Sequence, residues 1–365
     1  MSSVDKMPNG KWRARWRTPD GASRSRNFTR KADAEKHLTG IEHRKLSGEY
    51  VDSATGRVTF GEYARSWVAA QPHRPSTAAS LESMMKVHMI PAFGDRSFGK
   101  IRPSDVQAFI TGLPLAPTTV RTVYAKLSAI FAAAVLDRVI ASSPCTRAIK
   151  LPRLHGGEIT PMDPSEVRTV IDAVDERYAA LFLLMAGTGL RPGEALGVTV
   201  DRVEFLKRTI RIDRQLTTIT SVAEFAPVKT AASNRTVAVP DSVLDALAAH
   251  IRRFGTGRDG LLFTTANGQP IRRDQLGYAW RVAAKAAGIV DRTPHDLRHF
   301  AASVMIENGA SVKAVQRQLG HEKATTTLDT YAHLWSDAED VTRRALEVGV
   351  AAVVSHACHE ASSGN

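Results

Sequence analysis

The chain has 365 residues, of which 43% are hydrophobic and 24% are charged, and it holds two cysteines, Cys145 and Cys358. This is the composition of a globular protein of about two or three domains, and it excludes a collagen-like, a disordered or a disulfide-rich chain. Lysine and arginine outnumber the acidic residues by 49 to 37, a net charge of +12 that favours an anionic partner.

Nucleic acid is the partner that this charge favours over a membrane surface. The longest apolar runs, residues 129–136 and 179–186, are far shorter than the roughly 20 residues of a membrane-spanning helix. The first residues lack the apolar core of a secretory signal, and the scarcity of cysteine fits a reducing compartment. A basic soluble enzyme of another kind stays open, because charge alone does not exclude it.

The first 57 residues carry 13 lysines and arginines against 7 acidic residues. Residues 11–17 alternate basic and apolar side chains, which predicts a strand with Trp12, Ala14 and Trp16 on one face. Residues 18–21 form a predicted turn, a second strand ends near Phe28, and residues 31–46 show helical spacing.

A narrow sheet with a basic outer face suits the major groove of DNA. We expect DNA contacts from the basic residues of the two strands, which are Lys11, Arg13, Arg15, Arg17, Arg24 and Arg26. The alternative is a solvated basic edge that only blocks aggregation. DNA contact is favoured because four cations align beside an aromatic face.

Residues 48–57 form a predicted polar linker, and residues 58–148 are predicted to be helical. One helix runs through Phe60 and Val68, a second ends before Pro91, and a third covers residues 118–139. Their methionine and aromatic stripes are typical of a core. Proline and glycine between residues 143 and 157 then predict a domain boundary.

The last domain begins at Asp163 with a helix cap, an N1 proline and an N3 glutamate. A buried helix is expected at 179–186, then strands near 209–212, 224–229 and 236–239, and then helices to about residue 350. The C-terminal helix is placed at 337–354. The fold class expected is mainly α with small β elements.

Four short segments of this domain present residues that bind phosphate. They are residues 188–194, residues 227–230, residues 293–299, and residues 319–321 followed by Tyr331. In the third, Thr293 suits an N-cap and Pro294 suits N1, so His295 and Arg298 project from one face beside the positive end of a helix. An arginine there can bind phosphate through two nitrogens.

Two further residues of these segments keep alternative interpretations. His299 falls on another face of the same helix, where packing or a structural hydrogen bond is the favoured role. Arg191 follows a buried helix in a glycine-flanked turn. It is therefore either a helix C-cap or a rigidly held anion ligand.

Taken together and in this order, Thr-Gly-Leu-Arg-Pro-Gly-Glu, Val-Lys-Thr, His-Asp-Leu-Arg-His and Leu-Gly-His with a later tyrosine resemble the catalytic domain of tyrosine recombinases, the phage integrase family. The resemblance covers about residues 160–340 and extends more weakly toward the N-terminus. It implies an arm-type DNA-binding domain and linker at 1–57, a helical, SAM-like core-binding domain at 58–150, a catalytic domain at 157–350 and a tail at 351–365.

The resemblance implies that Tyr331 is the nucleophile and forms a 3′-phosphotyrosyl bond. It implies that Arg191 and Arg298 clamp the scissile phosphate, with Glu194 orienting the region around Arg191. Because guanidinium groups stabilise a phenolate, we expect them to lower the pKa of Tyr331 from its usual value near 10.

Lys229 is implied as the acid that protonates the leaving 5′-hydroxyl, His295 as an aid to proton transfer, and His321 as a hydrogen-bond donor to the phosphate. Phosphoryl transfer requires positioning and neutralisation of charge, which these side chains supply without a metal or other cofactor. A covalent intermediate also keeps the energy of the phosphodiester, so that the strands rejoin without ATP.

The implied function is site-specific recombination that integrates, and also excises, a phage or other mobile genome in the bacterial cytoplasm. The implied partners are double-stranded DNA at core and arm sites, three further copies of the chain in a tetramer, a host DNA-bending protein and a recombination directionality factor. The resemblance implies that the C-terminal tail docks on a neighbouring copy, and docking on its own copy is the alternative. No membrane partner is expected.

Three rival functions remain. A resolvase-type or topoisomerase IB-like enzyme would use the same site, although the basic N-terminal segment favours an integrase. A metal-dependent hydrolase would use His295, His299 and His321 but lacks the zincin glutamate. A DNA-binding protein without chemistry would not need Tyr331.

Overall fold

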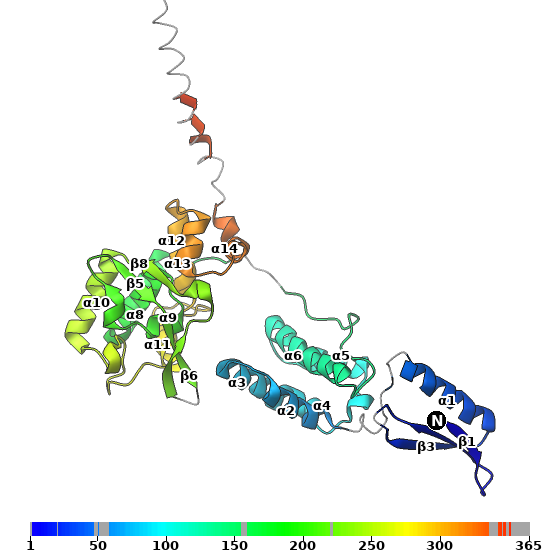
Figure 1. The fold of residues 1–365 in the computed structure, drawn as a ribbon. Coiled ribbons are helices and arrows are strands. Elements are labelled where there is room, and N and C mark those ends of the chain that lie inside the picture. The colour runs from blue at the N-terminus through cyan, green and yellow to red at the C-terminus, as the bar shows by residue number, and fades with distance from the viewer. Residues whose placement is uncertain are drawn as a thin grey trace, which may run out of the picture. The chain divides into compact units, whose positions relative to one another are not determined.

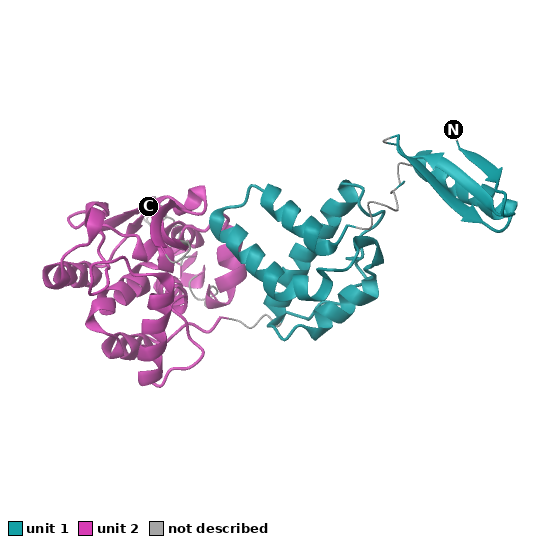
Figure 2. Cartoon of the chain, turned by 90° about the horizontal axis from the view of Figure 1, so that it is seen from below, with its two compact units in different colours: residues 1–156 teal, residues 157–365 magenta. Residues whose placement is uncertain are grey.

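The computed structural model describes residues 2–19, 21–46, 50, 58–154, 159–219, 222–335, 342–344, 346–347 and 350–351. The chain divides into two compact units, residues 1–156 and 157–365, which we call the N-terminal and C-terminal units (Figures 1 and 2). Apart from Tyr50, the linker predicted at 48–57 lies outside the described residues, as does most of the helix and tail predicted from residue 337.

The N-terminal unit begins with a three-stranded antiparallel sheet. Strands β1 (Ser3–Lys6), β2 (Trp12–Arg17) and β3 (Ser23–Phe28) lie in that order, and helix α1 (Lys31–Leu46) packs against them. Ala14 and Trp16 are buried against α1, and the Trp16 indole donates a hydrogen bond to the Tyr50 hydroxyl at 2.8 Å. The two predicted strands and the helix are confirmed, whereas β1 was not predicted.

The register of this sheet separates the basic residues that we expected at DNA. Arg24 pairs with Trp16 and Arg26 with Ala14, so these two arginines stand on the α1 side of the edge strand. Arg13, Arg15 and Arg17 alternate with the buried residues and stand on the opposite face. The predicted basic face is therefore formed by β2 alone of the two strands, and the arginines of β3 lie on the α1 side of the sheet.

A second hydrophobic core of the N-terminal unit is helical. Its elements are α2 (Phe60–Ala70), α3 (Pro75–Met84), η2 (Met85–Met89), α4 (Ile90–Phe93), η3 (Phe98–Lys100), α5 (Pro103–Gly112) and α6 (Pro117–Leu136). Among described helices, α6 has the length and composition of a membrane span, but Leu127, Ile130 and Phe131 on it are fully buried in this core.

The helix that we predicted to end before Pro91 continues through it. Residues 85–89 form one π-helical turn, and the Ile90 N–H bonds to the Met85 carbonyl instead of the carbonyl four residues back. A wider turn makes room for the proline ring, which would otherwise clash with the preceding turn. The prediction was wrong because a proline ends a helix only where the backbone does not widen.

The C-terminal unit surrounds the buried helix α8. Its elements are α7 (Pro164–Ala173), α8 (Glu176–Thr188), α9 (Pro192–Leu196), η4 (Val200–Arg202), β4 (Val203–Glu204), β5 (Thr209–Ile212), β6 (Arg214–Ile219), β7 (Val222–Pro227), η5 (Ala231–Ser233), β8 (Arg235–Ala238), α10 (Asp241–Phe254), η6 (Arg258–Gly260), α11 (Arg273–Ala286), α12 (Asp296–Glu307), α13 (Val312–Leu319), α14 (Ala324–Tyr331) and η7 (Ala332–Trp335).

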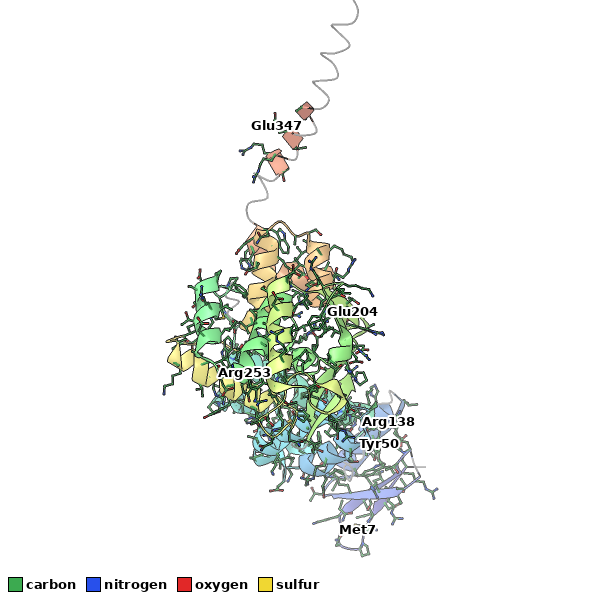
Figure 3. The ribbon with its side chains drawn as sticks, turned by 90° about the vertical axis from the view of Figure 1, so that its left-hand side faces the viewer. Met7, Tyr50, Arg138, Glu204, Arg253 and Glu347 are labelled. Carbon is green, nitrogen blue, oxygen red and sulfur yellow. The ribbon has the colours of Figure 1, made fainter. Side chains whose placement is uncertain are left out.

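Helices α7, α10 and α12 pack on α8, whose Phe182 and Leu184 are fully buried with Trp280 of α11. Strands β4, β5 and β8 form one small antiparallel sheet, and β6 and β7 form a separate hairpin. Charged side chains such as Glu204 and Arg253 lie at the surface around this core (Figure 3). The capped helix start at Asp163 and the three strands are confirmed, while β4 and β6 were not predicted.

Candidate active site

The junction between α8 and α9 holds Arg191 in a fixed position. Gly189 ends α8 in a left-handed conformation (φ 71°), and Arg191 is the N-cap residue of α9. Its Nη1 donates to Glu194 Oε1 at 2.7 Å and to Ser233 Oγ at 3.2 Å, and its Nη2 donates to the Gly320 carbonyl at 3.1 Å. Because none of these acceptors belongs to α8, Arg191 is a held side chain and not a cap of that helix.

Glu194 lies inside the protein, with only 3% of its surface exposed. Besides Arg191, it accepts from Arg235 of β8 at 3.1 and 3.3 Å, and Arg235 Nε donates to the Gln318 carbonyl at 2.8 Å. Burial alone would raise the pKa of Glu194, but the charges of Arg235 and Arg191 hold it below its usual value. Glu194 is therefore an anion shared by two arginines.

Sequence reasoning missed Arg235. The signal that was available is its position in a strand whose burial alternates, because Arg235 and Val237 both face inward from β8. A charged residue at an inward position of a strand is expected to have a buried partner.

Arg298 lies in the first turn of α12 and is 2% exposed. Its Nη1 donates to the Gly189 carbonyl at 2.6 Å and its Nη2 to the Leu319 carbonyl at 2.8 Å. Burial, with a further contribution from the charge of Arg191, lowers the pKa of Arg298 to about 9. Since Arg191 bonds to the next carbonyl, that of Gly320, the end of α13 brings the two guanidinium groups together.

The start of α12 differs from the prediction. The helix begins at Asp296 with His295 at the N-cap. Residues 293–296 form a separate turn before it, in which the Asp296 N–H bonds to the Thr293 carbonyl at 2.9 Å. The Thr293 hydroxyl donates to the Asp296 carboxylate at 2.8 Å instead of accepting a backbone N–H, so Thr293 does not cap the helix and Pro294 is not its first residue.

His295 still borders the site, with its ring edge-on to that of His299 at 5.1 Å between centroids. Although part of its surface is open, desolvation, and then the charges of His299 and Arg298, lower the pKa of His295 to about 4. His321 follows the left-handed Gly320, and its Nδ1 shares a hydrogen bond of 2.9 Å with the Thr327 hydroxyl. Burial, then Arg298 and Arg191, lower the pKa of His321 to about 4.

Tyr331 is the last residue of α14 and is 1% exposed. Its hydroxyl lies 2.8 Å from His299 Nδ1, and the two rings meet at 5.7 Å between centroids. Burial raises the pKa of Tyr331 to about 12, although the charge of Arg298 acts to lower it. The expectation of a lowered pKa was therefore wrong for the chain without DNA, because desolvation outweighs the guanidinium charge. The structural hydrogen bond favoured for His299 is made to this phenol.

Lys229 is not bonded to this cluster in the structure. It lies in the exposed turn after β7, and within the described residues it makes no hydrogen bond or ion pair. The three histidines considered for a metal do not gather around one point in the described ranges, where no group of three His, Cys, Asp or Glu side chains forms a metal site.

Comparison with known proteins identifies the architecture. Residues 161–337 match the phage integrase family, residues 2–48 match the phage integrase N-terminal domain, and residues 59–113 match the phage integrase N-terminal SAM-like domain. The chain belongs to the phage integrase family. It is thus a tyrosine recombinase, an enzyme of site-specific DNA recombination.

Individual relatives agree with this assignment. The putative prophage phiRv2 integrase of Mycobacterium tuberculosis is 28% identical over 90% of both chains, and a XerC-like tyrosine recombinase of Caldanaerobacter subterraneus is 27% identical over 83% of this chain and 85% of its own.

Solved structures share the fold. The Tn1549 transposon integrase bound to circular intermediate DNA has a TM-score of 0.68 at 22% identity, covering 77% of this chain and 97% of its own. A lambda integrase tetramer bound to a Holliday junction has a TM-score of 0.59 at 17% identity, covering 88% and 96%.

Proposed function

We propose that this tyrosine recombinase is an integrase of the phage type, in which Tyr331 cleaves DNA and remains joined to the 3′ phosphate until the strands exchange. The observation that carries the proposal is the convergence of Arg191, Arg298, His321 and the Tyr331–His299 pair around the left-handed ends of α8 and α13. Positioned cations around one phenol are what phosphoryl transfer without a metal requires.

The two arginines hold the phosphate. A guanidinium group has five N–H donors. Arg298 gives two of them to backbone carbonyls and Arg191 gives three to protein acceptors, so each keeps donors for the non-bridging oxygens. Glu194, which Arg235 holds in turn, fixes the orientation of the Arg191 guanidinium group. Glu194 therefore has a positioning role.

The remaining groups move protons and stabilise charge. Lys229 protonates the departing 5′ oxygen, and it reaches that atom when DNA draws the turn after β7 toward the site. His321 donates to a phosphate oxygen, and His295 assists proton transfer at the mouth of the site. The exposed position of Lys229 gives it the freedom that this movement needs.

The N-terminal sheet binds separate arm sites. Arg13, Arg15 and Arg17 of β2 enter the major groove, and Lys11 extends the same row. Arg24 and Arg26 on the α1 side of β3 contact the flanking backbone. The helical core around α6 binds the core site.

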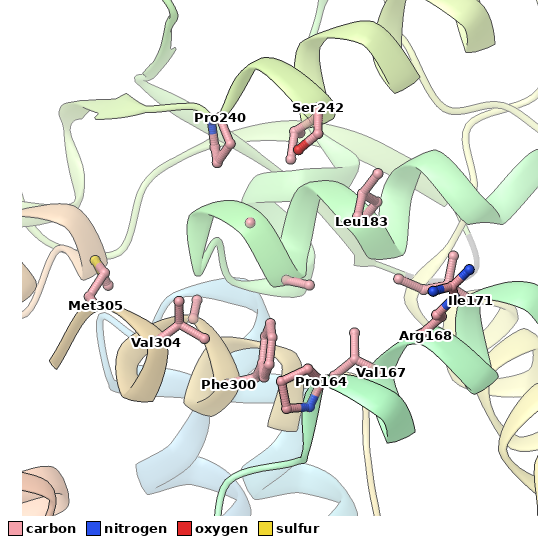
Figure 4. A pocket seen from close by; sticks show the side chains of 14 residues that line it. Pro164, Val167, Arg168, Ile171, Leu183, Pro240, Ser242, Phe300, Val304 and Met305 are labelled. Atoms are coloured by element: carbon pink, nitrogen blue, oxygen red, sulfur yellow. The ribbon is translucent and has the colours of Figure 1, made fainter. Parts of the chain in front are cut away.

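Four copies act together on two core sites. Pocket residues Val167, Leu183 and Phe300 belong to an apolar cavity of about 470 Å³ between α7, α8, α10 and α12 (Figure 4). Leu346 and Val350 near the C-terminus are 62% and 54% exposed. We assign this cavity to the C-terminal segment of a neighbouring copy. Replacing Leu346 and Val350 with aspartate should reduce tetramer formation on DNA in sedimentation runs and spare cleavage by single copies.

The deciding experiment traps the covalent intermediate. The protein is incubated with a nicked suicide duplex carrying the core site, and the residue joined to DNA is identified by mass spectrometry. We expect the adduct on Tyr331, and Tyr331→Phe should bind the duplex and form none. An adduct on another residue, or one that persists in Tyr331→Phe, contradicts the proposal.

Deleting residues 1–57 separates an integrase from a resolvase-type or topoisomerase IB-like enzyme. An integrase should keep its core footprint and lose a second set of footprints.

Host bending and directionality proteins belong to the same proposal, as does action in the bacterial cytoplasm. They are tested by adding a host extract to the purified recombination reaction, where integration or excision should be stimulated.

A further inference from the structure

Tyr331 and His299 are joined across two elements that are 32 residues apart in the chain. The phenol of α14 and the Nδ1 of a histidine in the first turns of α12 lie 2.8 Å from each other. In the tautomer that carries its proton on Nε2, His299 accepts the phenol hydrogen at Nδ1. The proposed nucleophile is therefore already bonded to a potential proton acceptor.

An acceptor is needed because the phenol is strongly protonated. Burial raises the pKa of Tyr331 to about 12, so the phenolate is scarce at neutral pH. Since Tyr331 is only 1% exposed, bulk water cannot freely take the proton. The proton has to leave through a neighbouring side chain.

Other groups near the phenol are poorly suited to that task. Arg298 is a cation without an acceptor atom. The Nδ1 of His321 is already bonded to Thr327, and Lys229 lies in an exposed turn without a bond to the site. His295 is exposed in the turn before α12, where its ring meets the ring of His299 and not the Tyr331 hydroxyl. Among the described side chains, His299 is the one that hydrogen-bonds the Tyr331 hydroxyl.

We propose that His299 is the general base for Tyr331, an inference that rests on the proposed nucleophile. As the Tyr331 oxygen bonds to phosphorus, its proton passes to His299 Nδ1, and the bond between phosphorus and the 5′ oxygen breaks. The 5′ oxygen takes its proton from Lys229. In rejoining, the 5′-hydroxyl attacks and returns its proton to Lys229, the phosphotyrosyl bond breaks, and His299 returns its proton to the phenol.

The surroundings of His299 keep it neutral before the reaction and stabilise its charge afterwards. Burial lowers its pKa from the usual value, Asp296 acts to raise it and Arg298 to lower it. The charged and titratable groups that face it are Asp296 and Arg298 on its own helix, His295 in the turn before it, and Tyr331 on α14. The bound phosphate adds a negative charge that favours the imidazolium as it forms.

The test compares His299→Asn with the unchanged protein. Asparagine keeps an acceptor near the Nδ1 position but takes up no proton at neutral pH. We expect its single-turnover cleavage of a suicide duplex to fall about 100-fold or more, which is the usual contribution of a general base. The acid side of the rate profile should flatten, while duplex affinity and melting temperature stay near those of the surface variant His43→Asn.

A more acidic nucleophile distinguishes proton removal from positioning. Placing 3,5-difluorotyrosine at residue 331 makes the phenol easier to ionise, so the loss caused by His299→Asn should shrink at least tenfold. A loss of the same size with both tyrosines, or a variant that cleaves within about threefold of the unchanged protein, overturns the inference. A DNA adduct at a residue other than 331 would instead overturn the assignment of the nucleophile.

Discussion

Arg235 Nη2 and Glu194 Oε2 lie 3.1 Å apart inside the C-terminal unit, with 5% and 3% of their side-chain surfaces exposed. The same carboxylate holds Arg191 at 2.7 Å. Arg191 owes its position to a buried ion pair that does not itself face DNA in the site we propose.

Arg235→Met should therefore damage both stability and cleavage. Removing one partner of a buried pair leaves Glu194 without part of its compensation, which costs about 3–5 kcal/mol of unfolding free energy. Chemical denaturation measures the loss, and suicide-duplex cleavage measures the effect on Arg191.

Arg253→Met is the matched control for this change. Arg253 pairs with Glu176 at the surface, where the side chains are 63% and 67% exposed (Figure 3). An exposed pair contributes about 0–1 kcal/mol, so this variant should keep near-normal stability. Equal losses of unfolding free energy in the two variants would show that burial of the Arg235–Glu194 pair does not contribute to stability.

Acid should destabilise the protein without DNA. The pKa of His321 is lowered to about 4 from its usual 6.5, so the unfolded chain binds more protons than the folded chain between those values. Stability from this group is present above pH 6.5 and falls with pH through that window, by up to about 2 kcal/mol at pH 5.

Thermal unfolding of the C-terminal unit from pH 7 to pH 4 tests this. His321→Asn should reduce the dependence on pH, whereas His43→Asn should leave it unchanged. Bound DNA should raise the pKa of His321 instead of lowering it, because a phosphate favours the protonated histidine. Identical pH curves for His321→Asn and the unchanged protein would contradict the assignment.

Gly189→Ala should weaken the site through the backbone. Gly189 has φ 71°, and an added Cβ would lie 2.5 Å from Leu319 Cδ2. Since the Gly189 carbonyl accepts from Arg298, a shifted turn should lower both the cleavage rate and the melting temperature.

Gly277→Ala on α11 provides the control for this glycine. The nearest atom to its added Cβ is the end of Arg281 at 3.6 Å, and alanine favours a helix by roughly 0.5–1 kcal/mol. This variant should be as stable as the unchanged protein or more so. A Gly189→Ala protein with normal cleavage would show that the turn tolerates the change.

Lys229→Ala should slow cleavage and respond to a better leaving group. A duplex with sulfur in place of the bridging 5′ oxygen needs no acid, so it should restore cleavage by Lys229→Ala. The same duplex should not restore cleavage by a variant that lacks the phosphate clamp, such as Arg191→Ala. If sulfur leaves the Lys229→Ala rate unimproved, Lys229 is not the acid.

The two faces of the N-terminal sheet should differ in DNA binding. Arg15→Ala on the open face should weaken arm-site binding by about 1–3 kcal/mol and relax sequence preference, as expected for a base contact. Arg26→Ala should weaken binding evenly across sequences and reduce its salt dependence. Mobility-shift titrations at several salt concentrations distinguish the two, and equal effects would contradict the separation of the faces.

Local patterns predicted most of the fold. The alternation of basic and apolar residues predicted β2, helical spacing of apolar residues predicted α1, and the cap at Asp163 predicted the start of α7. The start of α12 was misjudged because the Thr293 hydroxyl donates to the Asp296 carboxylate instead of capping the helix, and the sequence does not reveal which of these bonds it makes. Strand β6 was not predicted because its polar and apolar residues do not alternate clearly, and its pairing with β7 is not visible in the sequence.

The candidate site divides in the same way. Residues that lie in short motifs could be predicted from the order of four segments, as Arg191, Arg298 and Tyr331 were. Arg235 and His299 act through partners that lie 41 and 32 residues away, and no spacing rule connects them. Likewise, the raised pKa of Tyr331 depends on how deeply α14 is packed, which a sequence does not reveal.

Three arginines, Arg191, Arg235 and Arg298, lie around one carboxylate, Glu194, in the C-terminal unit. Burial, with repulsion from Arg191 and Arg235 adding to it, lowers the pKa of Arg298 to about 9. In the free enzyme this excess of positive charge is unfavourable, and an arriving phosphodiester neutralises part of it. Part of its affinity for DNA should come from this neutralisation, so an uncharged methylphosphonate at the scissile linkage should bind more weakly even where every base is correct.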